Sequence, residues 1–131
     1  MRPLGIAIAE DDWFLAEYLC GELAALGHAI AGRARTGEEL IDVVAHERPD
    51  VVLVDIALAY GSDGLAAARE VQKRFGIPAI AATGHLSADE VEMAGLLGIL
   101  SKPYTSHAVR AVLEEAAAWL ENGGSRPFLR R

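Results

Sequence analysis

The chain has 131 residues, a mass of 13.9 kDa and a formal net charge of −7 at neutral pH. Its 52% hydrophobic content excludes an intrinsically disordered chain, and its acidic balance argues against a nucleic acid or an anionic membrane as partner. One cysteine, Cys20, excludes an internal disulfide and suits a reducing cytoplasm. No apolar run reaches the ~20 residues that span a bilayer, and the amino terminus lacks signal-peptide features, so we expect no membrane association.

Short apolar runs alternate along the chain with longer segments of helical spacing. In chain order the runs are Leu4–Ala9, a weaker run at Ala29–Ala31, Val51–Val54, Ile77–Ala82 and Leu96–Leu100. Continuous apolar runs of this length are typical of parallel strands that are covered on both faces. The runs therefore predict five parallel strands.

The segments between the runs carry apolar stripes of helical period. The clearest stripes are Leu15, Leu19, Leu23 and Leu26; Leu65, Ala68, Val71 and Phe75; and Val109, Val112, Leu113, Ala116 and Leu120. Expected helix starts are Asp12, Thr36 with Glu39, Asp63, Ser87 with Glu90, and Thr105 or Ser106, and expected ends are Gly27, Gly76 and Gly123. The predicted fold is α/β: a doubly wound, five-stranded parallel sheet of (βα)5 topology, with helices on both faces.

This organisation predicts one domain over residues 1–122. The remaining residues, 123–131, lie beyond the last predicted helix and include three arginines and a proline. We expect them to form a flexible, basic carboxy-terminal tail.

Polar residues follow four of the predicted strands. Glu10 and Asp11 follow the first strand, and Asp55 follows the third. Thr83 follows the fourth strand, and Lys102 lies just after the fifth. Because ligands of open parallel sheets bind at the carboxyl ends of the strands, we expect these five side chains to share one edge.

The charges at that edge predict a cation. Two carboxylates ~4 Å apart repel by about 1 kcal/mol in water and about 4 kcal/mol at an effective dielectric constant of ~20. Mg²⁺ would relieve this repulsion, while Lys102 and the Thr83 hydroxyl could bind phosphoryl oxygens. Asp55 ends an apolar strand and is placed as a nucleophile for phosphoryl transfer. Singly, each residue has a simpler explanation: Asp12 is a helix cap, and acids at strand ends are usually only solvated.

Five segments together resemble the receiver domains of response regulators in bacterial two-component signalling. They are Ile8–Asp12, Val52–Ile56, Gly61–Gly64, Ala82–Gly84 and Leu100–Pro103. The resemblance covers residues 4–121 and implies the flavodoxin-like receiver fold. It also implies that Asp55 accepts a phosphoryl group from a phosphohistidine of a histidine kinase or a histidine phosphotransfer protein.

The same resemblance implies roles for the neighbouring residues. Mg²⁺ would be held by Asp11, Asp55 and the backbone carbonyl of Ala57, with Glu10 contacting it through water. Thr83 and Lys102 would bind the phosphoryl oxygens. A cis peptide bond is expected at Lys102–Pro103, since cis bonds are almost confined to proline.

The resemblance implies a stand-alone cytoplasmic response regulator and not an enzyme with a separate substrate. Too few residues follow the predicted domain to form an output domain. If the chain is complete, phosphorylation would act by changing the docking of a downstream protein. A second copy of the chain is another possible partner, through the fourth helix, fifth strand and fifth helix.

Two departures from the family pattern affect this expectation. Ile99 replaces the Tyr or Phe that the family usually uses as a rotamer switch, so a switch at that position is not expected. Ala57 has no polar side chain to orient a hydrolytic water, and we hypothesise slow dephosphorylation of Asp55. His85 is expected to be a surface residue. The apolar segment Gly95–Ile99 is either core or an exposed patch for a partner.

Three other functions remain open from the sequence. An interaction module of receiver fold would work without phosphorylation, although all the site positions are intact. A phosphatase with an aspartate nucleophile would need a second acid two residues after Asp55, where Ala57 stands. A flavin-binding protein would need a phosphate-binding loop after the first strand, and Glu10–Asp12 would repel phosphate.

Overall fold

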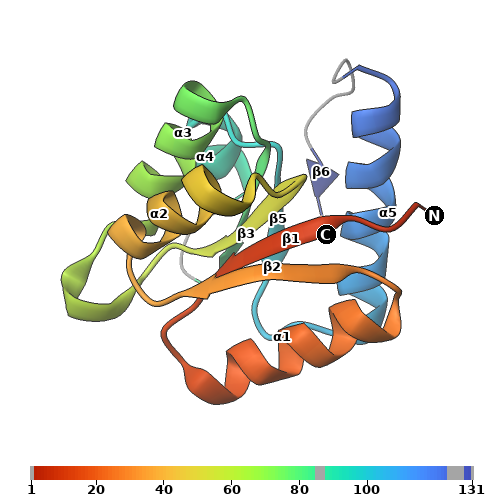
Figure 1. Ribbon diagram of the computed structural model, residues 1–131, viewed down its shortest axis with the longest axis horizontal. Coiled ribbons are helices and arrows are strands. Elements are labelled where there is room, and N and C mark those ends of the chain that lie inside the picture. The colour runs from red at the N-terminus through yellow and green to blue at the C-terminus, as the bar shows by residue number, and fades with distance from the viewer. Residues whose placement is uncertain (1, 85–87, 124–128, 131) are drawn as a thin grey trace.

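The computed structural model describes residues 2–84, 88–123 and 129–130 and shows one twisted parallel sheet (Figure 1). The sheet has the strand order β2-β1-β3-β4-β5-β6. Its strands are β1 (Gly5–Ala9), β2 (Ala29–Ala34), β3 (Val51–Asp55), β4 (Ala79–Thr83), β5 (Gly98–Ser101) and β6 (Leu129–Arg130). The five predicted strands are confirmed, and the weak run at Ala29 is the start of a six-residue strand.

The sixth strand was not expected. Leu129 and Arg130 pair in parallel with Gly98 and Ile99 of β5. An edge strand presents unpaired backbone N–H and C=O groups, and this pairing satisfies some of those of β5. Residues 129–130 therefore differ from the flexible tail expected over 123–131, while the division of the chain after residue 122 stays a prediction.

Five α-helices accompany the strands in the described residues. They are α1 (Trp13–Ala25), α2 (Gly37–Glu47), α3 (Gly64–Phe75), α4 (Ala88–Met93) and α5 (Ser106–Glu121), with a short 3₁₀ turn, η1 (Ala59–Gly61). The caps at Asp12, Thr36 and Asp63 are confirmed by side-chain acceptors for backbone N–H groups. Thr105 and not Ser106 caps α5. The predicted cap at Ser87 lies outside the described residues.

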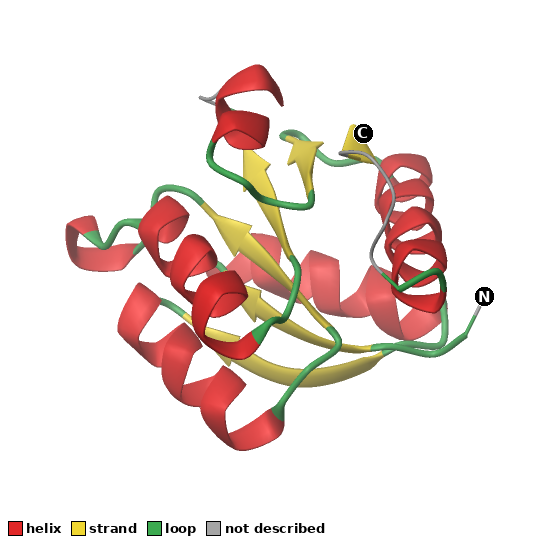
Figure 2. Cartoon of the chain, turned by 90° about the horizontal axis from the view of Figure 1, so that it is seen from above, coloured by secondary structure: helices red, strands yellow, loops and turns green. Residues whose placement is uncertain are grey.

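Helices cover both faces of the sheet (Figure 2). Successive strand residues point to opposite faces, so Ile6 and Ile8 join the core under α1 and α5, whereas Ala7 and Ala9 join the core under α2, α3 and α4. Every residue of β3 and of β4 is buried. This two-sided burial explains why those strands read as continuous apolar runs.

The apolar segment before β5 belongs to the core. Leu96, Leu97 and Ile99 are all buried, so the alternative of an exposed apolar patch at Gly95–Ile99 is wrong for these three side chains. Within the described ranges, no helix combines the length and hydropathy needed to cross a bilayer.

Candidate functional site

The register of the sheet brings the predicted site residues to one edge. Ala9 pairs with Val54, so Glu10 continues β1 beside Asp55 at the end of β3. Thr83 pairs with Ser101, which places Lys102 just beyond the neighbouring end of β5. The backbone N–H of Lys102 donates to the carbonyl of Thr83 at 3.0 Å. Four strand ends therefore supply the site.

Three carboxylates meet at this edge. Glu10, Asp11 and Asp55 each offer an oxygen within 4.8 Å of the others. Glu10 and Asp55 are 4% and 6% exposed, whereas Asp11 is half-buried. Hard oxygen donors this close together fit a divalent cation such as Mg²⁺. The predicted gathering of acids is thus present in the structure.

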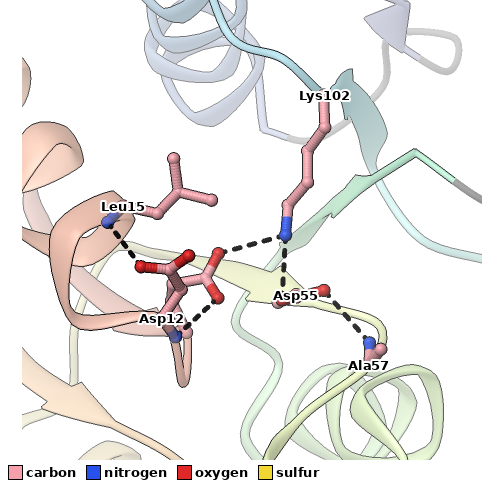
Figure 3. Close-up of polar contacts among 6 residues, drawn as sticks. Asp12, Leu15, Asp55, Ala57 and Lys102 are labelled. Atoms are coloured by element: carbon pink, nitrogen blue, oxygen red, sulfur yellow. Dashed lines mark hydrogen bonds and ion pairs between the residues drawn. The ribbon is translucent and has the colours of Figure 1, made fainter.

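Lys102 is the local counter-charge. Its Nζ lies 2.9 Å from Asp55 Oδ2, a contact drawn in Figure 3, and 3.2 Å from Glu10 Oε1. Burial lowers the pKa of Lys102, but the hydrogen bond to Asp55 and the charges of both acids outweigh it, so the pKa is raised. Lys102 therefore keeps its positive charge. The expected cis peptide bond at Lys102–Pro103 is present.

One cation does not balance three acids. Burial, a hydrogen bond with Asp55 and the charge of Asp55 raise the pKa of Glu10 from 4.5 to about 7, against the opposing effects of the Asp12 N–H and Lys102. The Asp12 N–H donates to Glu10 Oε2 at 3.1 Å. The raised pKa shows that the charged form of Glu10 is disfavoured here, and a further cation would remove that cost.

Backbone groups hold Asp55 from the other side. The N–H of Ala57 donates to Asp55 Oδ1 at 3.0 Å (Figure 3), while the Ala57 side chain is exposed. Gly64, the first residue of α3, touches the same backbone: a Cβ there would lie 1.9 Å from the carbonyl oxygen of Asp55 and 2.9 Å from Cα of Ile56. Only glycine fits this approach. Sequence reasoning included Gly64 in a family motif but gave it no role.

Ile99 and Tyr104 are buried on opposite faces of the sheet. Ile99, at the position of the family's switch aromatic, is buried under the α2–α3–α4 layer. Tyr104 lies in the opposite core and is 9% exposed. Sequence reasoning missed Tyr104, although its place two residues after Lys102 was a usable signal. His85 lies outside the described residues.

Comparison with known proteins agrees with this geometry. The family model described as "Response regulator receiver domain" matches residues 6–114. The "Phyllosphere-induced regulator PhyR" of Methylorubrum extorquens is 33% identical over 126 residues, which cover 92% of this chain and 46% of that protein. The "Transcriptional regulatory protein PdtaR" of Mycobacterium tuberculosis is 29% identical, with 88% of this chain and 58% of that protein covered. The chain thus spans about half the length of the curated relatives it matches.

Solved structures show the same architecture. The signal receiver domain of a modulated diguanylate cyclase from Desulfovibrio desulfuricans superposes with a TM-score of 0.83 at 26% identity, covering 93% of this chain and 99% of that one. The PhyR REC domain of Erythrobacter litoralis gives a TM-score of 0.80 at 30% identity, with 91% and 93% covered. With the family model matching most of its length, this chain belongs to the response regulator receiver domain family.

Proposed function

We propose that Asp55 accepts a phosphoryl group from a phosphohistidine on a partner histidine kinase or histidine phosphotransfer protein, and that this reaction requires Mg²⁺. One observation carries the proposal: the Asp55 carboxylate is held between the Ala57 N–H and Lys102 Nζ inside a cluster of three acids. A buried carboxylate oriented by two donors and surrounded by metal-ligating oxygens suits nucleophilic attack on phosphorus.

Asp11, Asp55 and the backbone carbonyl of Ala57 would hold the Mg²⁺ ion, with Glu10 contacting it through water. When bound, the ion neutralises charge on the acids and on the phosphoryl oxygens. The three carboxylate oxygens within 4.8 Å of one another support this assignment.

The chain's own groups account for the remaining steps. An oxygen of Asp55 bonds to phosphorus as the phosphorus–nitrogen bond breaks, and the electron pair of that bond stays on the partner's imidazole. Lys102, now paired with Asp55 Oδ2, turns to a phosphoryl oxygen. The hydroxyl of Thr83, at the end of β4, binds a second phosphoryl oxygen. The Ala57 N–H keeps the carboxylate oriented throughout.

The phosphorylated state is proposed to act by changing the docking of a downstream protein. A net charge of −7 favours a protein over nucleic acid as the target. Relatives named as regulators, and PhyR of Bartonella quintana, named as an anti-anti-sigma factor, support a role in regulation through protein partners. Association of two copies through α4, β5 and α5 belongs to the same proposal, and sedimentation with and without phosphorylation tests it.

Acetyl phosphate with Mg²⁺ tests the phosphoacceptor directly. Intact-mass spectrometry should show one added phosphoryl group on the wild-type chain. Asp55→Asn, or chelation of the metal, should abolish it. An unlabelled wild-type chain would favour the interaction module that works without phosphorylation. Steady turnover of p-nitrophenyl phosphate would favour the phosphatase instead.

A further inference from the structure

Tyr104 carries a buried donor beside the acidic cluster. Its side chain is 9% exposed, and within the described part of the chain its hydroxyl has no hydrogen-bond partner. Burial and the negative charges of Glu10 and Asp55 raise the pKa of the hydroxyl, which therefore keeps its proton and can only gain by donating it to an acidic oxygen. Buried hydroxyls are almost always hydrogen-bonded in native proteins, so this one calls for an explanation.

Glu10, whose charge acts on the Tyr104 hydroxyl, carries a candidate acceptor. Glu10 Oε1 is also buried and accepts no hydrogen bond within the described residues. Its contact with Lys102 Nζ at 3.2 Å is an ion pair, and the same ammonium donates to Asp55 Oδ2 at 2.9 Å. Among the described residues, the Tyr104 hydroxyl therefore lacks a partner, and Glu10 Oε1 depends on its contact with Lys102.

In the proposed reaction, phosphorylation gives the Lys102 ammonium a new partner. Once its ammonium turns to a phosphoryl oxygen, Glu10 loses its only cationic side-chain contact among the described residues. The Asp12 N–H still binds Oε2, but Oε1 is left without its contact, and a buried carboxylate oxygen without a partner is costly. Tyr104 follows Lys102 by two residues, and its hydroxyl is within electrostatic range of Glu10.

We propose that Tyr104 is a positioning residue of the phosphoacceptor site, whose hydroxyl donates to Glu10 Oε1 when Lys102 turns to the phosphoryl group. This inference rests on the proposed function of Asp55. It gives the chain an aromatic group that responds to phosphorylation although Ile99, at the family's usual switch position, has no ring. The responding ring lies on the opposite face of the sheet from Ile99.

The response reaches the surface through a pocket. Tyr104 lines an open, mainly apolar hollow of about 510 Å³ together with Leu15, Tyr18, Lys102 and Pro103. Two of these five residues, Lys102 and Tyr104, are the ones that move in the proposal. The shape of this hollow between α1 and the start of α5 therefore depends on whether Asp55 carries a phosphoryl group.

Tyr104→Phe tests the hydroxyl while keeping the ring. Tyr18→Phe is the matched control, because Tyr18 lines the same pocket, is 38% exposed and makes no hydrogen bond to the acids among the described residues. Both variants are titrated with beryllofluoride, a phosphoryl mimic, at saturating Mg²⁺. Tryptophan fluorescence reports binding, because Trp13 at the start of α1 directly follows Asp11 and Asp12. We expect Tyr104→Phe to weaken binding by about tenfold to a hundredfold, as loss of one hydrogen bond to a charged group does, and Tyr18→Phe to leave it unchanged.

Stability separates positioning from a merely structural role. Without mimic, Tyr104→Phe should be at least as stable as the wild type, because it removes a buried hydroxyl that has no partner. With mimic, it should gain less stability than the wild type. Equal binding and equal stabilisation in the two proteins would overturn the inference. So would a variant that is less stable in the absence of the mimic.

The signal of the Tyr104 ring gives a direct readout. The chain has three tyrosines, so ¹³Cζ labelling yields signals that Tyr→Phe substitutions assign. The Tyr104 signal should shift on addition of Mg²⁺ and beryllofluoride, and Glu10→Ala should remove most of that shift. A Tyr104 signal that stays in place while the wild type binds the mimic would refute the inference alone. A wild type that neither binds the mimic nor accepts a phosphoryl group would refute the proposed function as well.

Discussion

The two halves of the carboxyl edge of the sheet are built differently. The ends of β1 and β3 supply charge on short side chains that backbone groups hold: the Asp12 N–H binds Glu10, and the Ala57 N–H binds Asp55. The ends of β4 and β5 supply a hydroxyl, on Thr83, and an ammonium at the end of the long Lys102 side chain. The first half is suited to place a nucleophile and a metal, and the second to respond to what is attached.

The two departures from the family pattern lie on different halves. Ala57 follows β3, beside acids that match the family motif, whereas Ile99 lies in β5. In the proposals above, the groups that respond to a phosphoryl group, Lys102 and Tyr104, belong to the second half.

The largest effect is expected from a substitution at Gly64, which would disturb the backbone that holds Asp55. In Gly64→Ala the added Cβ would overlap the carbonyl of Asp55 at 1.9 Å, so β3 or α3 must shift. We expect a loss of about 3 kcal/mol in the free energy of unfolding, at the upper end for overpacking, and loss of labelling by acetyl phosphate. Urea denaturation and intact-mass spectrometry measure the two effects.

Gly21→Ala is the control for that substitution. Gly21 lies within α1, and nothing lies within 4 Å of a Cβ placed there. Replacing a helical glycine by alanine should stabilise the chain by up to about 1 kcal/mol. If Gly64→Ala were as stable and as readily labelled as Gly21→Ala, the close approach of α3 to Asp55 would not matter.

The repulsion among the crowded acids should make the free energy of unfolding depend on pH. The pKa of Glu10 is raised from 4.5 to about 7, so between these values the folded chain holds a proton that the unfolded chain has released. Without divalent cations, the free energy of unfolding should fall as the pH rises from 4.5 to 7, by up to about 3 kcal/mol. Urea denaturation across this range measures the slope.

Two comparisons tie that slope to Glu10. Glu10→Gln removes the titrating group and should flatten the pH dependence over this window. Mg²⁺ in excess should also flatten it, because a bound cation favours the ionised carboxylate. A slope of the same size in Glu10→Gln would assign it to other groups.

The contribution of the β4 and β5 ends is tested by substituting Lys102. Lys102→Gln leaves Glu10 and Asp55 without their cation and should lower the free energy of unfolding by about 1–3 kcal/mol without Mg²⁺. Mg²⁺ should restore most of this loss but not the rate of labelling, since the contact to a phosphoryl oxygen is gone. Lys73→Gln, on the exposed face of α3, should change neither quantity. If Lys102→Gln lowered the free energy of unfolding equally with and without Mg²⁺, Lys102 would act through packing instead.

Much of this site could be predicted because it depends on residues that are close together in the sequence. An apolar run that stops at an acid gives both the strand and the side chain at its end, as at Asp55. Helix caps such as Asp12 and Thr36 depend on neighbours two or three residues away. These features follow from residue order and from the parallel arrangement of the strands.

Features that depend on contacts between distant segments were not predictable in the same way. The role of Gly64 depends on how closely α3 returns to the backbone of Asp55. The unpaired hydroxyl of Tyr104 depends on which face of the sheet buries the residue. The pairing of residues 129–130 with β5 depends on an available edge and not on a strand-like pattern in a two-residue segment.

The smallest expected effect concerns the lifetime of the phosphorylated state. Ala57 is exposed, and its N–H already binds Asp55 Oδ1, so a longer side chain can be added there without disturbing the core. Ala57→Asn would supply an amide able to orient a water toward the phosphoryl group, and phospho-Asp55 should decay several-fold faster. Ala57→Val adds bulk without a polar group and should not accelerate decay. Loss of label over time after removal of acetyl phosphate measures both rates, and an unchanged rate in Ala57→Asn would rule out Ala57 as the cause of slow dephosphorylation.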